Sequence, residues 1–252
     1  MAEPLEIIVI SLRESTQRRA RAAAQLNAAG VAWRFQDAIK GAELPALPPE
    51  YHRARRLQLE GFDLNPAEIG CFLSHRQAWQ ACFKSQRPML ILEDDFRLKQ
   101  NLTEVLAEVC DCLPHFDVLR LQGIDTTYKY HVLKKFTRDQ LVRHHRDPLG
   151  TTAYVLQPAA AKRLLKKSVR FHEAVDDFMG GYWRHRLKIL SIFPFPIGSD
   201  GSPSTVQNFG KPSLPLNSLK KLLTKLHKLP VSAARRLHWL GLRLALCRRW
   251  PE

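Results

Sequence analysis

Three consecutive carboxylates are the first residues of this chain whose types and spacing could do chemistry. Glu93, Asp94 and Asp95 directly follow the apolar run 88–92. Adjacent carboxylates repel one another, so a pKa rises among them unless a cation neutralises the charge. Hard oxygen ligands at the end of a buried strand suit Mg²⁺ or Mn²⁺, held jointly with a substrate diphosphate. The alternative is a solvated turn or the start of a helix, where acidic residues are also favoured.

A second acidic pair, Asp176 and Asp177, lies between apolar neighbours in the segment 175–179. Apolar surroundings raise the pKa of a carboxylate towards the range of a general base. The first turn of a helix explains the same pair without any catalytic role. His75 is a further candidate, one helical turn before Trp79, although a lone helical histidine is more often a core or surface residue.

The common nucleotide-binding and hydrolase signatures are absent from the sequence. It contains no G-x-x-x-x-G-K-[ST] and no G-x-G-x-x-G. The segment 172–176 lacks the second histidine of H-E-x-x-H, and 198–202 is not a G-x-S-x-G elbow. P-loop NTPases, dinucleotide oxidoreductases, zincins and α/β-hydrolases therefore lose support.

The elements that must position these acids follow from the hydrophobic pattern. Apolar runs predict strands at 5–12, 32–36, 88–92, 116–121, 152–156 and 187–193. Helical spacing and capping residues predict helices at 15–29, from Asn65 onwards, and at 101–113, 158–167 and 173–185. Residues 41–64 and 194–218 are expected to be irregular, and 123–148 have no clear pattern. The alternation predicts an α/β fold with a Rossmann-type, mainly parallel sheet flanked by helices. Ligands bind such sheets beyond the carboxyl ends of the strands, where the first acidic run lies.

The chain is strongly basic. It has 252 residues, with 39 Lys and Arg against 24 Asp and Glu and a net charge of +15. We expect a domain over 1–197, a Pro/Ser/Gly-rich linker or loop over 198–215, and a basic amphipathic helical tail over 216–252. An anionic membrane surface is the partner expected for the tail. Nucleic acid and ordinary packing are the alternatives.

Five cysteines without a C-x-x-C pair predict buried free thiols in a reducing compartment. No signal peptide is recognisable at the first apolar run, and no stretch reaches the about 18 apolar residues of a membrane-spanning helix. We therefore expect a cytoplasmic protein.

Six segments follow one another between residues 5 and 197, and together they resemble one family. They are 8–12 with Arg18 and Arg19 beyond, 35–39, 68–75 followed by Trp79, 90–95, 150–154 and 175–179. In this order they resemble glycosyltransferase family 25, which includes the bacterial lipooligosaccharide and lipopolysaccharide β-galactosyltransferases. The resemblance implies a GT-A fold, a nucleotide-sugar donor, typically UDP-galactose, a divalent metal, Mn²⁺ or Mg²⁺, and inversion at the anomeric carbon.

The resemblance also implies roles for individual residues. Glu93 and Asp95 would hold the metal, and Asp176 or Asp177 would be the catalytic base. The donor would be bound by Ser11, Leu12, Arg13, Asp37, Ser74, His75, Glu93 and Asp94.

These observations predict an inverting, metal-dependent transferase that moves a hexose, galactose first among them, to a lipid-linked lipopolysaccharide core oligosaccharide. Its basic charge suits an anionic acceptor and a peripheral position on the cytoplasmic face of the inner membrane. One alternative is a catalytically inactive relative that acts as a membrane-surface scaffold. Another is a nucleic-acid-binding protein, which explains the charge but neither the acidic clusters nor the lack of a binding motif.

Overall fold

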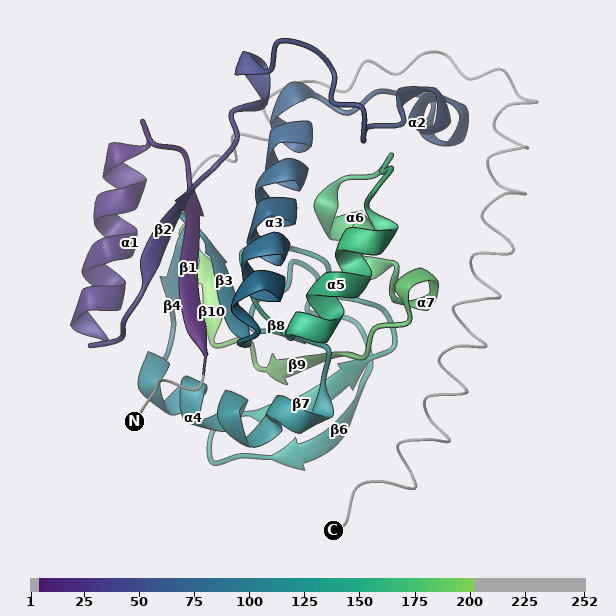
Figure 1. Cartoon of the computed structure of the whole chain (residues 1–252). Coiled ribbons are helices and arrows are strands. Elements are labelled where there is room, and N and C mark those ends of the chain that lie inside the picture. The colour runs from purple at the N-terminus through teal and green to yellow at the C-terminus, as the bar shows by residue number, and fades with distance from the viewer. Residues whose placement is uncertain (1–4, 202–252) are drawn as a thin grey trace.

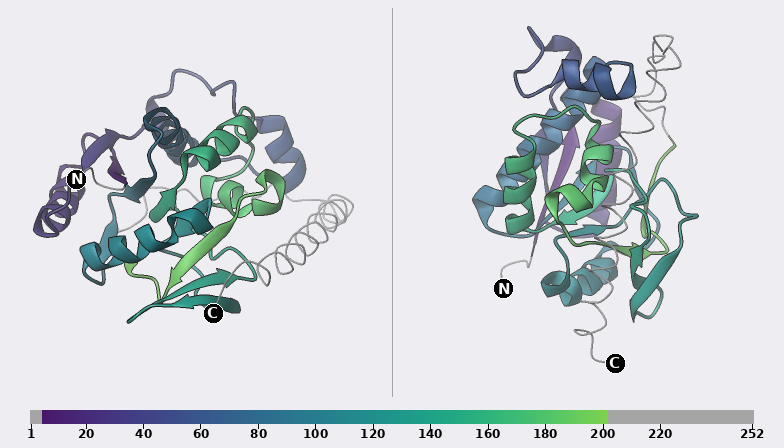
Figure 2. Two further views of the ribbon diagram at one scale, coloured as in Figure 1. Left: turned by 60° about the horizontal axis from the view of Figure 1, so that its bottom comes forward. Right: turned by 90° about the vertical axis from the view of Figure 1, so that its right-hand side faces the viewer.

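The computed structural model describes residues 5–201 of the chain. The tail predicted over 216–252 and nearly all of the predicted linker lie outside the described residues. One large sheet forms the centre of the molecule, and helices pack against both of its faces (Figure 1). Figure 2 shows the same arrangement from two further directions.

The strands and helices have the following bounds. The strands are β1 (Glu6–Ser11), β2 (Arg34–Asp37), β3 (Met89–Glu93), β4 (Phe96–Leu98), β5 (Val118–Arg120), β6 (Tyr130–Lys135), β7 (Gln140–His144), β8 (Ala153–Leu156), β9 (Ile189–Phe193) and β10 (Ile197–Ser199). The helices are α1 (Thr16–Ala28), α2 (Arg53–Glu60), α3 (Pro66–Ser85), α4 (Leu102–Cys112), α5 (Pro158–Lys167), α6 (Val175–Gly180) and α7 (Tyr182–His185). Two 3₁₀ turns cover Gly41–Glu43 and Leu113–His115.

The large sheet has the strand order β2-β1-β3-β8-β5-β9-β7-β6. β1 is parallel to β2 and β3, and β5 is parallel to β9. β8 and β7 run antiparallel to their neighbours, so the other six of the eight strands share one direction. This mixed α/β sheet, mainly parallel and covered by helices, confirms the predicted fold class.

The register of β1 brings the candidate residues to one edge of the sheet. Ser11 is the partner of Asp37 on β2, and Ile10 is the partner of Glu93 on β3. Because the three strands are parallel, their carboxyl ends meet there, at the edge where ligands bind such sheets.

Both faces of the central strands are buried, which explains their nearly continuous apolar sequences. Ile8 and Ile10 of β1 belong to the core beneath α3 and α5, whereas Ile7 and Val9 belong to the core beneath α1 and α4. Successive side chains of a strand point to opposite faces, so one short segment supplies both cores.

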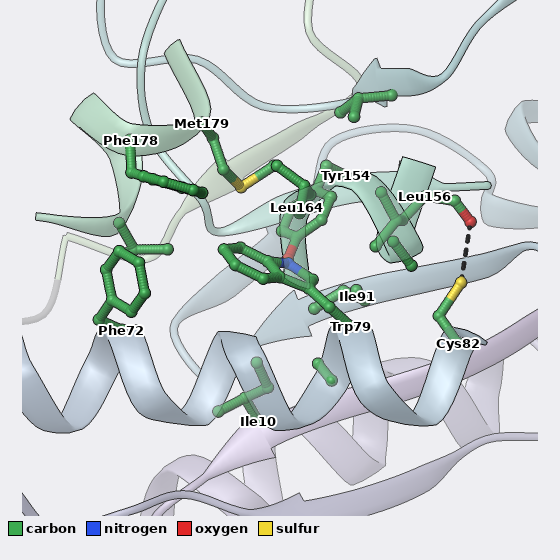
Figure 3. Packing of buried hydrophobic residues seen from close by; sticks show 14 of the residues in the cluster. Ile10, Phe72, Trp79, Cys82, Ile91, Tyr154, Leu156, Leu164, Phe178 and Met179 are labelled. Carbon is green, nitrogen blue, oxygen red and sulfur yellow. Dashed lines mark hydrogen bonds between the residues drawn. The ribbon is translucent and has the colours of Figure 1, made fainter. Parts of the chain in front are cut away.

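Helix α3 begins at the predicted capping box. The Asn65 side chain accepts a hydrogen bond from the Glu68 amide, and the Glu68 carboxylate accepts one from the Asn65 amide, each over 2.8 Å. Further along α3, Trp79 is fully buried beside Phe178 and near Tyr154 (Figure 3). This packing fixes the rotation of α3 about its axis and therefore the direction of its polar residues.

Some segments differ from the prediction. Residues 41–64 contain the arginine-rich helix α2, and 123–148 form the β6–β7 hairpin. β10 pairs with β4, so the predicted linker 198–215 begins inside a strand. Ser15 precedes α1 as expected, but its side chain makes no cap hydrogen bond. The short strands β4 and β10 and the exposed strand β6 have too little buried surface to impose a recognisable apolar pattern.

Candidate functional site

A cleft of about 470 Å³ opens at the carboxyl ends of β1 and β3. Its walls are the end of β1, the loop 38–42, the first half of α3 and the acidic run after β3. Seven residues predicted from the sequence line it: Ser11, Leu12, Ser74, His75, Glu93, Asp94 and Asp95. The fold therefore gathers most of the predicted donor-binding and metal-binding residues in one place.

The loop 38–42 is held against α3 at two glycines. A Cβ atom on Gly41 would lie 1.6 Å from the Pro66 carbonyl oxygen, and one on Gly70 would lie 2.5 Å from the Ile39 carbonyl oxygen. The Ser74 hydroxyl accepts a hydrogen bond from the Ile39 amide over 2.8 Å and donates one to the Gly70 carbonyl over 2.7 Å. Ser74 thus lines the cleft, and its hydroxyl fastens the cleft wall.

A chain of hydrogen bonds runs from the core to the acidic run. The Trp79 indole donates to the Tyr154 hydroxyl over 2.9 Å, and this hydroxyl lies 2.9 Å from Nδ1 of His75. Nε2 of His75 lies 3.0 Å from Oε1 of Glu93. An indole only donates and an ionised carboxylate only accepts. In the assignment that we adopt, the Tyr154 hydroxyl donates to Nδ1 and His75 donates from Nε2 to Glu93.

Glu93 is held in its ionised form. Burial by itself raises the pKa of Glu93, but the hydrogen bond and electrostatic effect of His75, together with the hydrogen bond from Thr151, outweigh burial and lower that pKa. Arg18 adds a smaller favourable charge. The pKa of Glu93 lies below its ordinary value, so the group is a carboxylate at neutral pH.

Asp94 points back towards β1 and α1. Its Oδ2 accepts a hydrogen bond from the Ser11 hydroxyl over 2.6 Å, and its Oδ1 accepts one from Arg18 over 3.2 Å. The charge of Asp94 is therefore neutralised by the protein itself. This pair also brings Arg18, a cation, into the lining of the cleft.

Asp95 has a carboxylate oxygen that lacks a hydrogen-bond partner among residues 5–201. Its Oδ2 accepts a hydrogen bond from the Ser199 hydroxyl over 3.1 Å, whereas its Oδ1 is buried and has no hydrogen-bond partner among residues 5–201. Burial, followed by repulsion from Glu93 and Asp94, raises the pKa of Asp95 to about 6. A divalent cation would relieve both the repulsion and the missing hydrogen bond, so Glu93 and Asp95 fit the metal that the resemblance implies.

Cys71, His75 and Glu93 also offer three ligand atoms within 4.8 Å of one another. However, both ring nitrogens of His75 are already engaged, with Tyr154 and with Glu93. Burial and the nearby carboxylates raise the pKa of the Cys71 thiol well above its ordinary value. Because thiolates and free imidazoles are the forms that bind metals, this trio is a poorer site than the oxygen pair.

Two predicted donor-binding residues lie outside the cleft lining. Arg13 and Asp37 form an ion pair of 2.5 Å on the surface, and Arg19 also pairs with Asp37 over 2.8 Å. The Arg13 side chain is 83% exposed. The structure places both residues at the predicted sheet edge but uses them in a surface ion cluster.

Asp176 and Asp177 form the first turn of α6 but have different surroundings. The charge of Asp176 acts on the Cys71 thiol, which lines the cleft. Desolvation by the surrounding chain, then repulsion from Asp176 and Glu173, raises the pKa of Asp177 to about 6. Asp177 also interacts with Arg56 of α2. Neither aspartate is among the residues that line the cleft.

Several residues of the site received no role from the sequence. Arg18 and Lys40 line the cleft, and Thr151 and Tyr154 hold Glu93 and His75. Thr151 and Tyr154 belong to the segment 150–154 that contributes to the family resemblance, and Arg18 follows the segment 8–12. Membership in these segments was the sequence signal that could have identified the three residues. Lys40 offered no signal. Within residues 5–201, none of the helices is both long and apolar enough to cross a membrane.

Comparison with known proteins agrees with the resemblance. Residues 5–179 match the model of glycosyltransferase family 25, described as an LPS biosynthesis protein. The lipooligosaccharide biosynthesis protein lic2B of Haemophilus influenzae is 28% identical over 165 residues, which cover 62% of this chain and 60% of that protein. The lacto-N-neotetraose biosynthesis glycosyltransferase LgtB of Neisseria gonorrhoeae is 30% identical over 135 residues, 50% of this chain and 45% of LgtB.

A mammalian relative is also similar. The inactive glycosyltransferase 25 family member 3 of Mus musculus is 29% identical over 194 residues, 69% of this chain. The matched region is 31% of the mouse protein, so the chain spans only part of each of these relatives.

Proposed function

Because the chain belongs to glycosyltransferase family 25, we propose that it is an inverting, metal-dependent hexosyltransferase. Its donor is UDP-galactose and its acceptor is a lipid-linked lipopolysaccharide core oligosaccharide. The observation that carries the proposal is the pair Glu93 and Asp95, an ionised carboxylate beside a buried carboxylate oxygen without a hydrogen-bond partner among residues 5–201. Both line a cleft at the carboxyl ends of parallel strands. The names of lic2B and LgtB support a glycan acceptor.

The residues of the cleft have different roles in the proposed transfer. A divalent ion held by Glu93 and Asp95 would supply positive charge to the diphosphate leaving group. His75 and Thr151 keep Glu93 ionised and oriented. Arg18 contributes a further positive charge on the same side of the cleft.

The acceptor needs a base that removes the proton of its hydroxyl as the sugar is transferred with inversion. We assign this role to Asp176, which is half-buried and whose charge contributes to the raised pKa of Cys71 in the cleft lining. Phe178, the next residue but one, packs against Phe72 of α3 and anchors the turn that presents the base.

The experiment that tests the proposal measures UDP release and sugar transfer from UDP-galactose, UDP-glucose and UDP-N-acetylhexosamines, each with Mn²⁺ or with EDTA. We expect metal-dependent release from UDP-galactose and none with EDTA. Equal release in EDTA would refute the metal requirement. Preference for another UDP-sugar would change the proposed donor, whereas the proposed reaction, metal-dependent glycosyl transfer, would still hold.

A second candidate is a family member without catalysis that acts as a membrane-surface scaffold, since the mouse relative is named inactive. Calorimetry separates the two. Donor binding without turnover would direct attention to a missing acceptor, whereas no donor binding at all would favour the scaffold.

We further propose that the protein is peripheral on the cytoplasmic face of the inner membrane, held there by its basic segment 211–252. This segment has ten Lys and Arg against one acid. Co-sedimentation of the full chain with anionic vesicles, and its loss at high salt, would support the proposal. Equal binding to neutral vesicles would contradict it, as would tighter binding to RNA than to vesicles.

A further inference from the structure

Two histidines meet at the β6–β7 hairpin. This hairpin lies at the opposite end of the strand order from β1 and β2 (Figure 1). In the register of the hairpin Tyr130 is opposite His144, and His131 is opposite Arg143. His131 and His145 are therefore diagonal neighbours on one face of the hairpin. Their Nε2 atoms are 3.2 Å apart, and their rings are 24° from parallel with centroids 5.0 Å apart.

We propose that His131 and His145 form a two-histidine site for a borderline divalent metal ion such as Zn²⁺. With metal–nitrogen bonds of about 2.0–2.1 Å, two nitrogens 3.2 Å apart subtend an angle of about 103° at the ion. That angle is close to the tetrahedral arrangement that zinc adopts in proteins. Both residues are exposed, so water can occupy the remaining coordination positions.

The chemistry of the donors distinguishes this site from the acidic cleft. Imidazole nitrogens suit zinc, copper and nickel, whereas the carboxylates of Glu93 and Asp95 suit magnesium and manganese. The two sites therefore select different ions from the same solution.

The hairpin fixes the backbone of both histidines without an ion. His131 of β6 pairs with Arg143 of β7, and the His145 amide donates a hydrogen bond to the Lys129 carbonyl over 2.9 Å. A hydrogen bond between two exposed rings stabilises the fold little, because water competes for both partners. A preorganised pair, by contrast, lowers the entropy lost on chelation, and the bound ion would link the two strands at the edge of the sheet.

Nearby cations set the strength of the site. Arg143 lies opposite His131 in the register, and Lys129 is the backbone partner of His145. These positive neighbours repel a metal ion, so we expect weaker binding than at a site closed by four protein ligands.

The test is a calorimetric Zn²⁺ titration of the full chain, without a histidine tag and freed of metal by a chelator. An Asp95→Asn background removes one metal-binding carboxylate of the cleft, and the trio of Cys71, His75 and Glu93 is the same in every variant compared. In it, His131→Ala and His145→Ala are each expected to weaken Zn²⁺ binding by at least about tenfold, because the preorganised pair is lost. His115→Ala removes an imidazole elsewhere and should leave the titration unchanged.

An independent readout identifies the ligands directly. Paramagnetic resonance of the Cu²⁺-loaded chain should show coupling to two nitrogens, reduced to one in either single variant. Zn²⁺ should also raise the melting temperature of the parent chain and not that of the double variant. Unchanged Zn²⁺ affinity in the double variant, or a copper spectrum without nitrogen coupling, would overturn the proposal.

Discussion

His75 donates a hydrogen bond from Nε2 to Oε1 of Glu93 over 3.0 Å, which joins the middle of α3 to the end of β3. The other ring nitrogen is held by Tyr154, so the imidazole has one orientation and one donor direction. The histidine therefore acts on the metal-binding pair through Glu93, as an outer partner that orients a ligand.

His75→Ala should weaken Mn²⁺ binding and lower kcat/KM by about 10–100-fold, the usual effect of removing an outer partner. The physical reason is that Glu93 loses a hydrogen bond that favours its charged form. Metal titration and donor kinetics measure both effects. Tyr154→Phe keeps the ring and removes only the hydroxyl, so it should have a smaller effect in the same direction. An equal or larger effect of Tyr154→Phe would contradict the assigned chain of hydrogen bonds.

Asp95→Asn should abolish metal-dependent UDP release without destabilising the protein. The charged Asp95 has a raised pKa and an unpartnered buried oxygen, so replacing it with an isosteric amide removes repulsion from Glu93 and Asp94. Urea denaturation should give an unfolding free energy equal to or above that of the parent chain. Ser199→Ala, which removes the donor to Oδ2 and a long contact with the Gly201 amide, is the control and should retain most of the turnover. Wild-type turnover in Asp95→Asn would remove Asp95 from the metal site.

The two aspartates of α6 should respond differently to the same substitution. Asp176→Asn is expected to lower kcat by about 10²–10⁴-fold, the contribution typical of general base catalysis. Asp177→Asn should keep kcat within about tenfold of the parent, because the exposed Asp177 is not the proposed base. Single-turnover transfer with saturating donor measures both. A larger loss of kcat in Asp177→Asn than in Asp176→Asn would identify Asp177 as the general base.

Asp177 should also make stability depend on pH. Its pKa is raised to about 6 in the folded chain from 3.8. The folded state therefore holds this proton more tightly than the unfolded state, and the associated stability is lost as pH rises through about 6. Asp177→Asn removes the effect, so the variant should gain unfolding free energy relative to the parent between pH 5 and pH 7.5. Denaturation at the two values tests this, and a relative loss at pH 7.5 would contradict the raised pKa.

Gly70→Ala should loosen the cleft wall. The new Cβ would lie 2.5 Å from the Ile39 carbonyl oxygen and 2.6 Å from the Gly41 amide nitrogen, and backbone atoms cannot rotate away. Overpacking costs about 1–3 kcal/mol, and alanine recovers about 1 kcal/mol of helix propensity, so the net loss reaches about 2 kcal/mol. The donor KM should rise because the loop 38–42 is displaced. Gln77→Ala, at an exposed position of α3, is the matched control and should change neither quantity.

Local patterns in the chain predicted most of the elements. The buried strands are apolar on both faces, and the capping box of Asn65 and Glu68 is complete within four residues. Such signals depend on neighbours in the sequence, so they can be read without the fold. β6 was not predicted because it is exposed, β7 because it buries the polar residues Arg143 and His144, and β4 and β10 because each has only three residues.

The residue types of the site were evident from the sequence, but the partners of those residues were not. Glu93, Asp94 and Asp95 are consecutive, yet one is held by His75, one by Arg18 and one keeps an oxygen without a partner among residues 5–201. These differences depend on α3, α1 and β10, whose contacting residues lie 18, 76 and 104 positions from their partners in the acidic run. Sequence order fixes which groups are available, whereas burial and long-range contacts fix the charge, orientation and partner of each.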